Sequence, residues 1–180
     1  MKALVPIANG CEEMEAVIII DTLRRAQWHV TTAGLTEGTI EASRGVKLVP
    51  DVSWDRIDPD DFDIILLPGG FGGTEALMKH AGVQQALRDF NDRGKWIGAI
   101  CAAALALNEA GLLNGRRFTC YPGVEKKLPA DIQPVNEIVV VDGHLITSQG
   151  PGTAFEFALQ VIAECDSPNR SAEVRAGLLL

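Results

Sequence analysis

Short apolar runs alternate along the chain with segments in which apolar residues recur every three or four positions. Apolar runs bounded by turn residues are typical of buried parallel strands, and the longer spacing is typical of amphipathic helices. The alternation predicts an α/β fold with a mainly parallel central sheet, flanked by helices and joined by right-handed crossovers. We expect strands at 2–7, 28–33, 63–67, 95–100 and 117–120, a β-hairpin joining 137–141 to 144–148 through Asp142-Gly143, and a small β excursion at 41–49.

Helical patterns fill the intervals between these strands. The first of them carries acidic residues in its first turn and Arg24-Arg25 in its last, in agreement with the helix macrodipole. No repeat, linker or low-complexity segment interrupts the alternation, so we expect residues 1–180 to form a single domain. Helices are expected at 12–27, 73–80, 83–92, 102–110, 149–164 and 169–177.

Composition and charge exclude some classes of protein for this chain. The chain has 47% hydrophobic and 22% charged residues and a formal net charge of -8, which is ordinary for a globular protein. Basic residues are scattered and form no stripe, so we expect no nucleic-acid partner. The apolar runs are shorter than the ~20 residues that span a bilayer, and no signal-peptide pattern is evident, so we expect a cytoplasmic protein without membrane contact.

The four cysteines are far apart and lack the spacing of metal ligands or of a C-x-x-C redox pair. In a reducing compartment such residues are mostly free thiols, and each is by default a small buried apolar residue. We therefore expect no metal site. No flavin cofactor is expected either, because the loop after the first strand, 8–13, is acidic and not rich in Ser and Thr.

Cys101 stands where the apolar run at 95–100 turns into an alanine-rich helix. Ligands of open parallel sheets bind at the carboxyl ends of strands, and a helix N-terminus lowers the pKa of a thiol. Small neighbours permit the tight strand–nucleophile–helix turn known from hydrolases. The pattern favours a reactive cysteine, and the alternative is a core cysteine at a strand-to-helix junction. The small neighbours are Gly98, Ala99, Ala102, Ala103 and Ala104.

Two other features favour a site at Cys101. Pro68-Gly69-Gly70 ends the neighbouring predicted strand, and its backbone N–H groups, together with that of Ala102, would form an oxyanion hole; the alternative is a loop that only turns a corner. Glu15 lies on the apolar face of the first helix, where desolvation raises a carboxyl pKa and favours the neutral, proton-donating form. The alternative is an acid at the rim of that face.

A histidine base for Cys101 is not evident. His29 begins a predicted strand, His80 ends a helical pattern and His144 flanks a hairpin turn, so each is expected to be structural or exposed. A Cys/His couple is therefore poorly supported.

Four motifs, in this order and spacing, resemble the ThiJ/PfpI superfamily over almost the whole chain, in the branch that includes the human parkinsonism-associated deglycase and the bacterial protein YajL. The resemblance implies a flavodoxin-like sandwich and a homodimer. The motifs are Glu12-Glu13-Met14-Glu15, Leu67-Pro68-Gly69-Gly70, Ala99-Ile100-Cys101-Ala102 and Thr147-Ser148-Gln149-Gly150-Pro151-Gly152-Thr153.

The resemblance also implies roles for single residues. Cys101 would be the nucleophile and Glu15 its protonated partner, while Gly69, Gly70 and Ala102 would bind substrate or oxyanion through their backbone. Arg25 and Arg44 would lie near the dimer interface, close to the partner's site. The chain departs from many family members at Tyr121, where they carry a histidine, and Cys120 next to it would be a second thiol near the pocket.

The family implies a glutathione-independent glyoxalase acting on α-oxoaldehydes such as methylglyoxal, or a deglycase acting on their adducts, without a cofactor. The alternative is a thiol sensor of oxidative stress, or a redox-regulated chaperone, in which Cys101 is oxidised to a sulfinate. Peptidases and amidotransferase-like members of the superfamily use a histidine soon after the nucleophile strand, and Tyr121 argues against both. Without that histidine, Glu15 alone favours aldehyde isomerisation or redox sensing.

Overall fold

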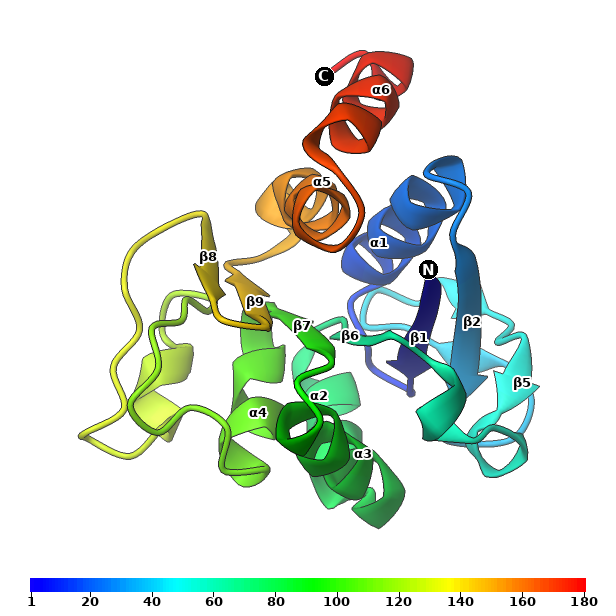
Figure 1. Ribbon diagram of the computed structural model, residues 1–180. Coiled ribbons are helices and arrows are strands. Elements are labelled where there is room, and N and C mark those ends of the chain that lie inside the picture. Colours follow the sequence, from blue (N-terminus) through cyan, green and yellow to red (C-terminus); the bar gives the residue numbers. More distant parts are fainter.

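The computed structural model describes all residues, 1–180, and contains a seven-stranded sheet with the order β5-β2-β1-β6-β7-β9-β8 (Figure 1). Every strand pair in it is parallel except β9 with β8, which form the hairpin predicted at Asp142-Gly143. The mainly parallel α/β sheet predicted from the pattern is confirmed. The strands are β1 (Lys2–Ile7), β2 (His29–Gly34), β5 (Val52–Ser53), β6 (Ile64–Leu67), β7 (Trp96–Ile100), β8 (Val139–Asp142) and β9 (Leu145–Ser148).

Helices cover both faces of the sheet (Figure 1). One face carries α1 (Glu13–Arg25) and α5 (Ala154–Cys165), with α6 (Pro168–Leu178) packed on the outer side of α5. The other face carries α2 (Phe71–Lys79), α3 (Ala81–Asp92) and α4 (Ala104–Glu109). Because β6 is covered on both sides, all four of its residues are apolar and buried, as the continuous apolar run predicts.

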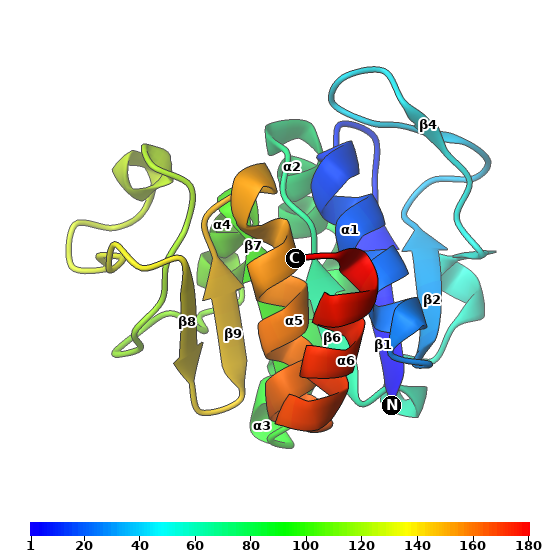
Figure 2. The same ribbon diagram turned by 90° about the horizontal axis from the view of Figure 1, so that it is seen from above.

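The topology places a crevice between β1 and β6. From β1 the chain runs outward to β2 and β5, and it then returns to β6 on the other side of β1. Such a reversal in strand order is the switch point at which open α/β sheets bind ligands. Figure 2 shows that α1, α2 and α5 begin at the same end of the sheet, above the carboxyl ends of the strands.

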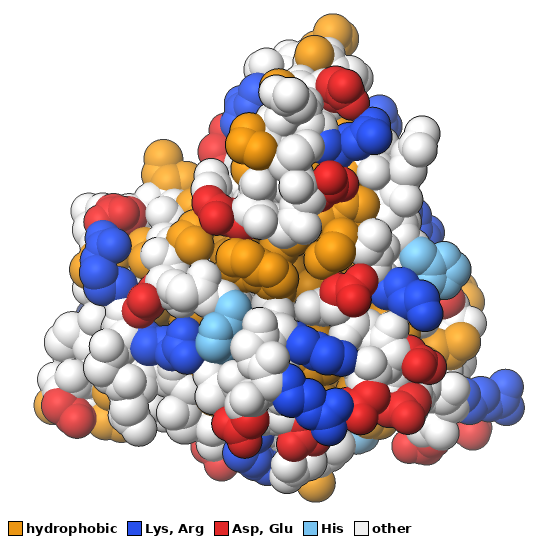
Figure 3. Space-filling model, viewed as in Figure 1, with side chains coloured by type: hydrophobic (Ala, Val, Ile, Leu, Met, Phe, Trp, Pro, Cys, Tyr) orange, Lys and Arg blue, Asp and Glu red, His pale blue; other side chains and the backbone are white.

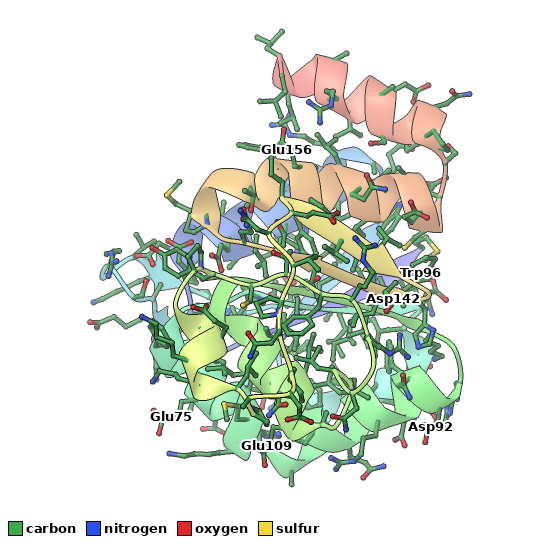
Figure 4. All side chains as sticks on the ribbon, turned by 90° about the vertical axis from the view of Figure 1, so that its left-hand side faces the viewer. Glu75, Asp92, Trp96, Glu109, Asp142 and Glu156 are labelled. Carbon is green, nitrogen blue, oxygen red and sulfur yellow. The ribbon has the colours of Figure 1, made fainter.

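The strand expected at 117–120 does not form. This segment is irregular: both sides of β9 are taken by β7 and β8, and the segment does not add to the free outer edge of β8. Its backbone is satisfied in other ways: the N–H of Thr119 donates to Thr147 Oγ1 at 2.9 Å, and the C=O of Phe118 accepts from the N–H of Val135 at 2.8 Å. The long connection 111–138, yellow-green in Figure 4, holds only the short 3-10 helix η4 (Val124–Lys127).

Two smaller features refine the predicted pattern. The β excursion at 41–49 is confirmed as the antiparallel pair β3 (Ile40–Glu41) and β4 (Lys47–Leu48), whereas the two-residue strand β5 was not anticipated.

Gly98 is small for a reason unrelated to the turn at Cys101: a Cβ there would lie 2.4 Å from Leu66 Cδ2 and 2.9 Å from Phe157 Cζ. Its role is to let α5 pack closely on the sheet.

The surface at the amino ends of the parallel strands carries charges of both signs side by side (Figure 3). None of the helices combines the length and the apolar character needed to cross a membrane.

Candidate active site

Cys101 lies at a strained turn between β7 and α4. The chain leaves β7 at Ile100, and Cys101 adopts φ +64° before the 3-10 turn η3 (Cys101–Ala103) leads into α4. A positive φ costs a non-glycine residue about 1–3 kcal/mol and persists only where the surrounding structure enforces it. The turn directs the thiol toward Glu15 of α1 and Gly70 of the loop after β6.

Three groups from separate parts of the chain surround the sulfur of Cys101. The backbone N–H groups of Ala102 and Gly70 point at the sulfur, and the carboxyl group of Glu15 lies beside it. Cys101 is 9% exposed, so the residue is largely enclosed. The structure thus brings together the cysteine, the acid and the two N–H groups that the sequence selects.

Glu15 is fully buried on α1, with 0% of its surface exposed. The N–H of Gly69 donates to Glu15 Oε2 at 2.7 Å, whereas Oε1 has no hydrogen-bond partner. Burial is the main influence on this group and raises its pKa to about 7, against the lowering effect of the bond from Gly69. The unpartnered oxygen can therefore hold a proton or accept one near neutral pH.

The protonation of Cys101 depends on that of Glu15. Burial, followed by the negative charge of ionised Glu15, raises the pKa of the thiol to about 12, while the N–H groups of Ala102 and Gly70 act to lower it. The lowered thiol pKa expected from the helix N-terminus is therefore wrong. Protonation of Glu15 removes the repulsion but leaves burial, the largest cause of the raised thiol pKa, in place.

The glycine pair after β6 is required by close backbone contacts. A Cβ on Gly69 would lie 2.7 Å from Cys101 Cβ and 2.8 Å from Glu15 Oε2. Gly70 has φ +83°, and a Cβ there would lie 2.4 Å from the carbonyl oxygen of Gly10. Only glycine at these two positions lets the loop after β6 reach both the sulfur and the carboxyl group.

Glu12 has a part in the site that the sequence analysis missed. It is the N-cap of α1: its Oε2 accepts the N–H of Glu15 at 2.7 Å, and its own N–H donates to the carbonyl of Gly69 at 2.9 Å. Glu12 thereby ties the start of α1 to the glycine loop and orients Glu15. The available signal was the acidic residue three positions before Glu15, at the start of a helix.

Tyr121 and Cys120 lie on the connection next to the nucleophile. The N–H of Tyr121 donates to the carbonyl of Cys101 at 3.3 Å, and its half-exposed ring packs against Gly150, where a Cβ would lie 3.0 Å from the ring. Cys120 is buried and lines a separate hollow of about 400 Å³ together with Glu125. Burial, then the charge of Glu125, raises the pKa of the Cys120 thiol to about 11.

Arg25 and Arg44 have other partners within the chain. Arg25 Nε pairs with Asp21 at 2.6 Å near the end of α1, and Arg25 lines a hollow beside α6. Arg44 is exposed, and its N–H donates to Glu13 Oε1 at 2.7 Å, two residues from Glu15.

The three histidines lie away from Cys101, as expected. His29 is exposed, His80 caps α3 by accepting the N–H of Val83 at 3.3 Å, and His144 Nε2 lies 3.3 Å from Asn91 Oδ1. No three His, Cys, Asp or Glu side chains meet in a way that would hold a metal ion.

The fold and the site together define a flavodoxin-like α/β protein with a strained cysteine at the strand switch point, paired with a buried glutamate. The chain belongs to the DJ-1/PfpI family, whose family model matches residues 1–164. It is 43% identical to protein dj-1beta of Drosophila melanogaster over 181 residues, covering 99% of this chain and 97% of the relative. The crystal structure of that protein superimposes with a TM-score of 0.95 at 42% identity, covering 99% and 97% of the two chains.

Two further relatives bear on function. The chain is 33% identical to a protein of Caenorhabditis elegans named glutathione-independent glyoxalase DJR-1.2, covering 96% of this chain and 92% of the relative. Toxoplasma gondii DJ-1, solved in an oxidized form, superimposes with a TM-score of 0.94 at 37% identity, covering 99% of this chain and 97% of the other.

Proposed function

We propose that this protein is a cysteine-dependent, cofactor-free glyoxalase that converts α-oxoaldehydes such as methylglyoxal into hydroxyacids without glutathione. The observation that carries the proposal is a thiol beside a carboxyl group with a pKa of about 7, facing two backbone N–H groups. A group whose pKa lies near the working pH both donates and accepts protons readily. The name of the C. elegans relative supports the same class of reaction.

The proposed reaction begins when the sulfur of Cys101 attacks the aldehyde carbon. A C–S bond forms, the electron pair of the carbonyl moves to oxygen, and the N–H groups of Gly70 and Ala102 stabilise the resulting oxyanion. The oxyanion takes up the proton that the thiol released. The product of this step is a hemithioacetal on Cys101.

Glu15 then moves one proton. Its carboxylate removes the hydrogen from the carbon bound to sulfur, which gives an enediol, and returns the proton to the neighbouring carbon, which leaves a thioester. Water cleaves the thioester, and lactate leaves from methylglyoxal or glycolate from glyoxal. The sum adds one water to the aldehyde and transfers no electrons to an outside acceptor, so the chemistry needs no redox cofactor.

The same thiol and acid support a deglycase reaction on early methylglyoxal adducts of Cys, Lys or Arg, which would release the same hydroxyacid. We further propose a cytoplasmic protein that protects against carbonyl and oxidative stress and works as a homodimer.

A second function rests on the same geometry. The N–H groups of Gly70 and Ala102, with the proton of Glu15, are placed to bind the oxygens of an oxidised Cys101, as in a thiol sensor or a redox-regulated chaperone. That a related protein was solved in an oxidized form supports this second candidate.

The deciding measurement is methylglyoxal consumption in the absence of glutathione, followed as lactate formation. We expect Cys101→Ser to abolish turnover and Cys165→Ser, which changes a half-buried thiol on α5, to leave it intact. Equal turnover in wild type and Cys101→Ser would exclude the proposed nucleophile. An inactive wild type whose Cys101 gains oxygen under mild peroxide, seen by mass spectrometry, would favour the sensor.

A further inference from the structure

A groove of about 410 Å³ lies between α2, α4 and η4. It has apolar and charged walls, and none of its residues belongs to the machinery described above. Glu75, on its rim, and the yellow-green turn of η4 lie at the same edge of the molecule (Figure 4). We call it the α2–η4 groove, and it is lined by Phe71, Thr74, Glu75, Met78, Leu105 and Lys127.

Two residues of the α2–η4 groove follow, in the chain, the residues around the reacting sulfur. Phe71 directly follows Gly70, whose N–H faces Cys101, and it is the first residue of α2. Leu105 follows Cys101 by four residues, which is about one helical turn. Two lining residues are thus close in the chain to the residues around the sulfur, so a substituent on a carbonyl held there would extend toward the groove.

Half of the groove's lining residues are apolar: Phe71 is exposed, Met78 is half-buried and Leu105 is 8% exposed. Phe71 is 56% exposed although it is a large aromatic residue, and Met78 and Leu105 extend the apolar surface. Exposed aromatic and apolar side chains gathered in a hollow are the usual lining of a site for a small organic ligand. The ring of Phe71 offers such a ligand a stacking surface.

The groove also contains polar groups without partners. Lys127 Nζ lies 5.3 Å from the centre of the Phe71 ring and pairs with no carboxylate, since Glu75 is the ion-pair partner of Lys79. Thr74 is 1% exposed, and its hydroxyl has no hydrogen-bond partner although the residue lines the groove. An ammonium group beside an aromatic ring is complementary to an aryl group that carries an anion, and the carboxylate of Glu75, which also feels the charge of Lys127, is engaged by Lys79.

We propose that the α2–η4 groove is the subsite for the substituent of the α-oxoaldehyde, and that it takes an aryl group ending in a carboxylate. The aryl ring would lie against Phe71, Met78 and Leu105, and the carboxylate would meet Lys127. The proposal rests on the proposed function. The methyl group of methylglyoxal leaves this subsite unused, so the groove favours larger α-oxoaldehydes.

The test compares kcat/KM for methylglyoxal, phenylglyoxal and 4-carboxyphenylglyoxal, each converted with one water into the corresponding hydroxyacid. Phe71→Ala is expected to lower the ratio of kcat/KM for phenylglyoxal to that for methylglyoxal by about fivefold, the size of one aromatic contact. Lys127→Gln is expected to lower the ratio of kcat/KM for 4-carboxyphenylglyoxal to that for phenylglyoxal by about threefold, because the variant loses one exposed ion pair with the substrate carboxylate. Lys126→Gln, at an exposed neighbour outside the groove, is the matched control and should leave all ratios unchanged.

A second readout separates this inference from the proposed function. Binding of 4-carboxymandelate to Cys101→Ser, followed by NMR or calorimetry, needs no turnover and should weaken when Phe71→Ala or Lys127→Gln is added. An enzyme that consumes methylglyoxal but shows unchanged ratios and unchanged product binding in both variants overturns the subsite alone. A protein that consumes no methylglyoxal, yet binds the product through Phe71 and Lys127, overturns the glyoxalase and retains the groove as a site for this ligand class.

Discussion

Glu15 combines full burial with the absence of an ionic partner, and this combination governs the chemistry of Cys101. The carboxyl group receives one hydrogen bond, from the N–H of Gly69, and its other oxygen is unpartnered. Burial penalises its charged form, so the folded protein holds the proton of Glu15 to higher pH than the unfolded chain does. The same proton removes the negative charge that, after burial, does most to raise the pKa of the neighbouring thiol.

Glu15→Gln should therefore change how stability depends on pH. The pKa of Glu15 rises from 4.5 to about 7 on folding, so its contribution to the free energy of unfolding is fully present below pH 4.5 and declines as the pH rises toward 7. The decline is on the order of 3 kcal/mol. Glutamine cannot ionise, so the variant should lose this part of the decline in urea unfolding measured between pH 4.5 and 7.

The control for this measurement is Glu41→Gln, which changes an exposed glutamate on β3. It should keep the wild-type dependence on pH. If the free energy of unfolding of both Glu15→Gln and Glu41→Gln depends on pH as in the wild type, the pKa of Glu15 is not raised by burial.

At the scale of elements, side chains bond to the backbone along the part of the outer edge of β2 that has no neighbouring strand. On this outer side, β5 pairs only with Ala33 and Gly34, so the first part of β2 has no neighbouring strand there. Asp51 Oδ2 accepts the N–H of Thr32 at 2.8 Å, and Arg24 donates to the carbonyl of Val30 at 3.1 Å. The two side chains also pair with each other at 2.9 Å, so an ion pair occupies main-chain positions that a further strand would use.

Asp51→Ala should destabilise the protein by about 1–2 kcal/mol, because it leaves the backbone N–H of Thr32 and the guanidinium of Arg24 without their acceptor at a half-exposed site. Burial works to raise the pKa of Asp51, but the bonds from Thr32 and the charge of Arg24 hold it below its usual range. This contribution is therefore present at neutral pH and is lost as the medium becomes strongly acidic. Urea unfolding at pH 7 measures the effect.

Asp55→Ala is the matched control for the edge of β2. Asp55 lines the same hollow as Asp51 and is exposed. It makes no side-chain hydrogen bond, so its removal should change the free energy of unfolding by no more than about 0.5 kcal/mol. An equal effect of the two substitutions would show that the edge does not depend on Asp51.

For the whole molecule, the outer face of α1 is the surface best suited to a second copy of the chain. Met14 and Val17 are exposed one helical turn apart, and the exposed Val46 follows Arg44, whose backbone is bonded to Glu13 of α1. Exposed apolar side chains that lie close together are typical of protein–protein contacts. The family resemblance implies that Arg25 and Arg44 lie near this proposed interface.

Val17→Asp should convert a dimer into a monomer, because it places a charge in the apolar centre of the proposed interface. Light scattering should give the mass of two chains for the wild type and of one chain for the variant. Ile138→Asp, at an exposed apolar residue on the long connection before β8, should keep the wild-type mass. A wild type with the mass of one chain, or a Val17→Asp variant with that of two, would remove α1 from the interface.

The sequence by itself determined the elements and most residues of the site. Strand and helix periods, the Asp142-Gly143 turn and the glycines after the strand at 63–67 are local signals, because backbone geometry and turn chemistry act over a few residues. The rule that parallel strands gather their carboxyl ends at one edge then places Cys101 and the Gly69-Gly70 loop at the same end of the sheet. The apolar helix face that carries Glu15 was likewise evident from spacing alone.

Only the tertiary structure decided which groups touch. The contact of Glu15 with Cys101 and the link from Glu12 to Gly69 join residues far apart in the chain, and burial at that contact raises the thiol pKa that local sequence suggested would fall. The segment 117–120 has strand-like composition, but it pairs with no strand, and its backbone bonds instead to the Thr147 side chain and to Val135. Strand pairing, desolvation and the α2–η4 groove depend on which surfaces meet in the folded chain, and the pattern of residues along the sequence does not specify those contacts.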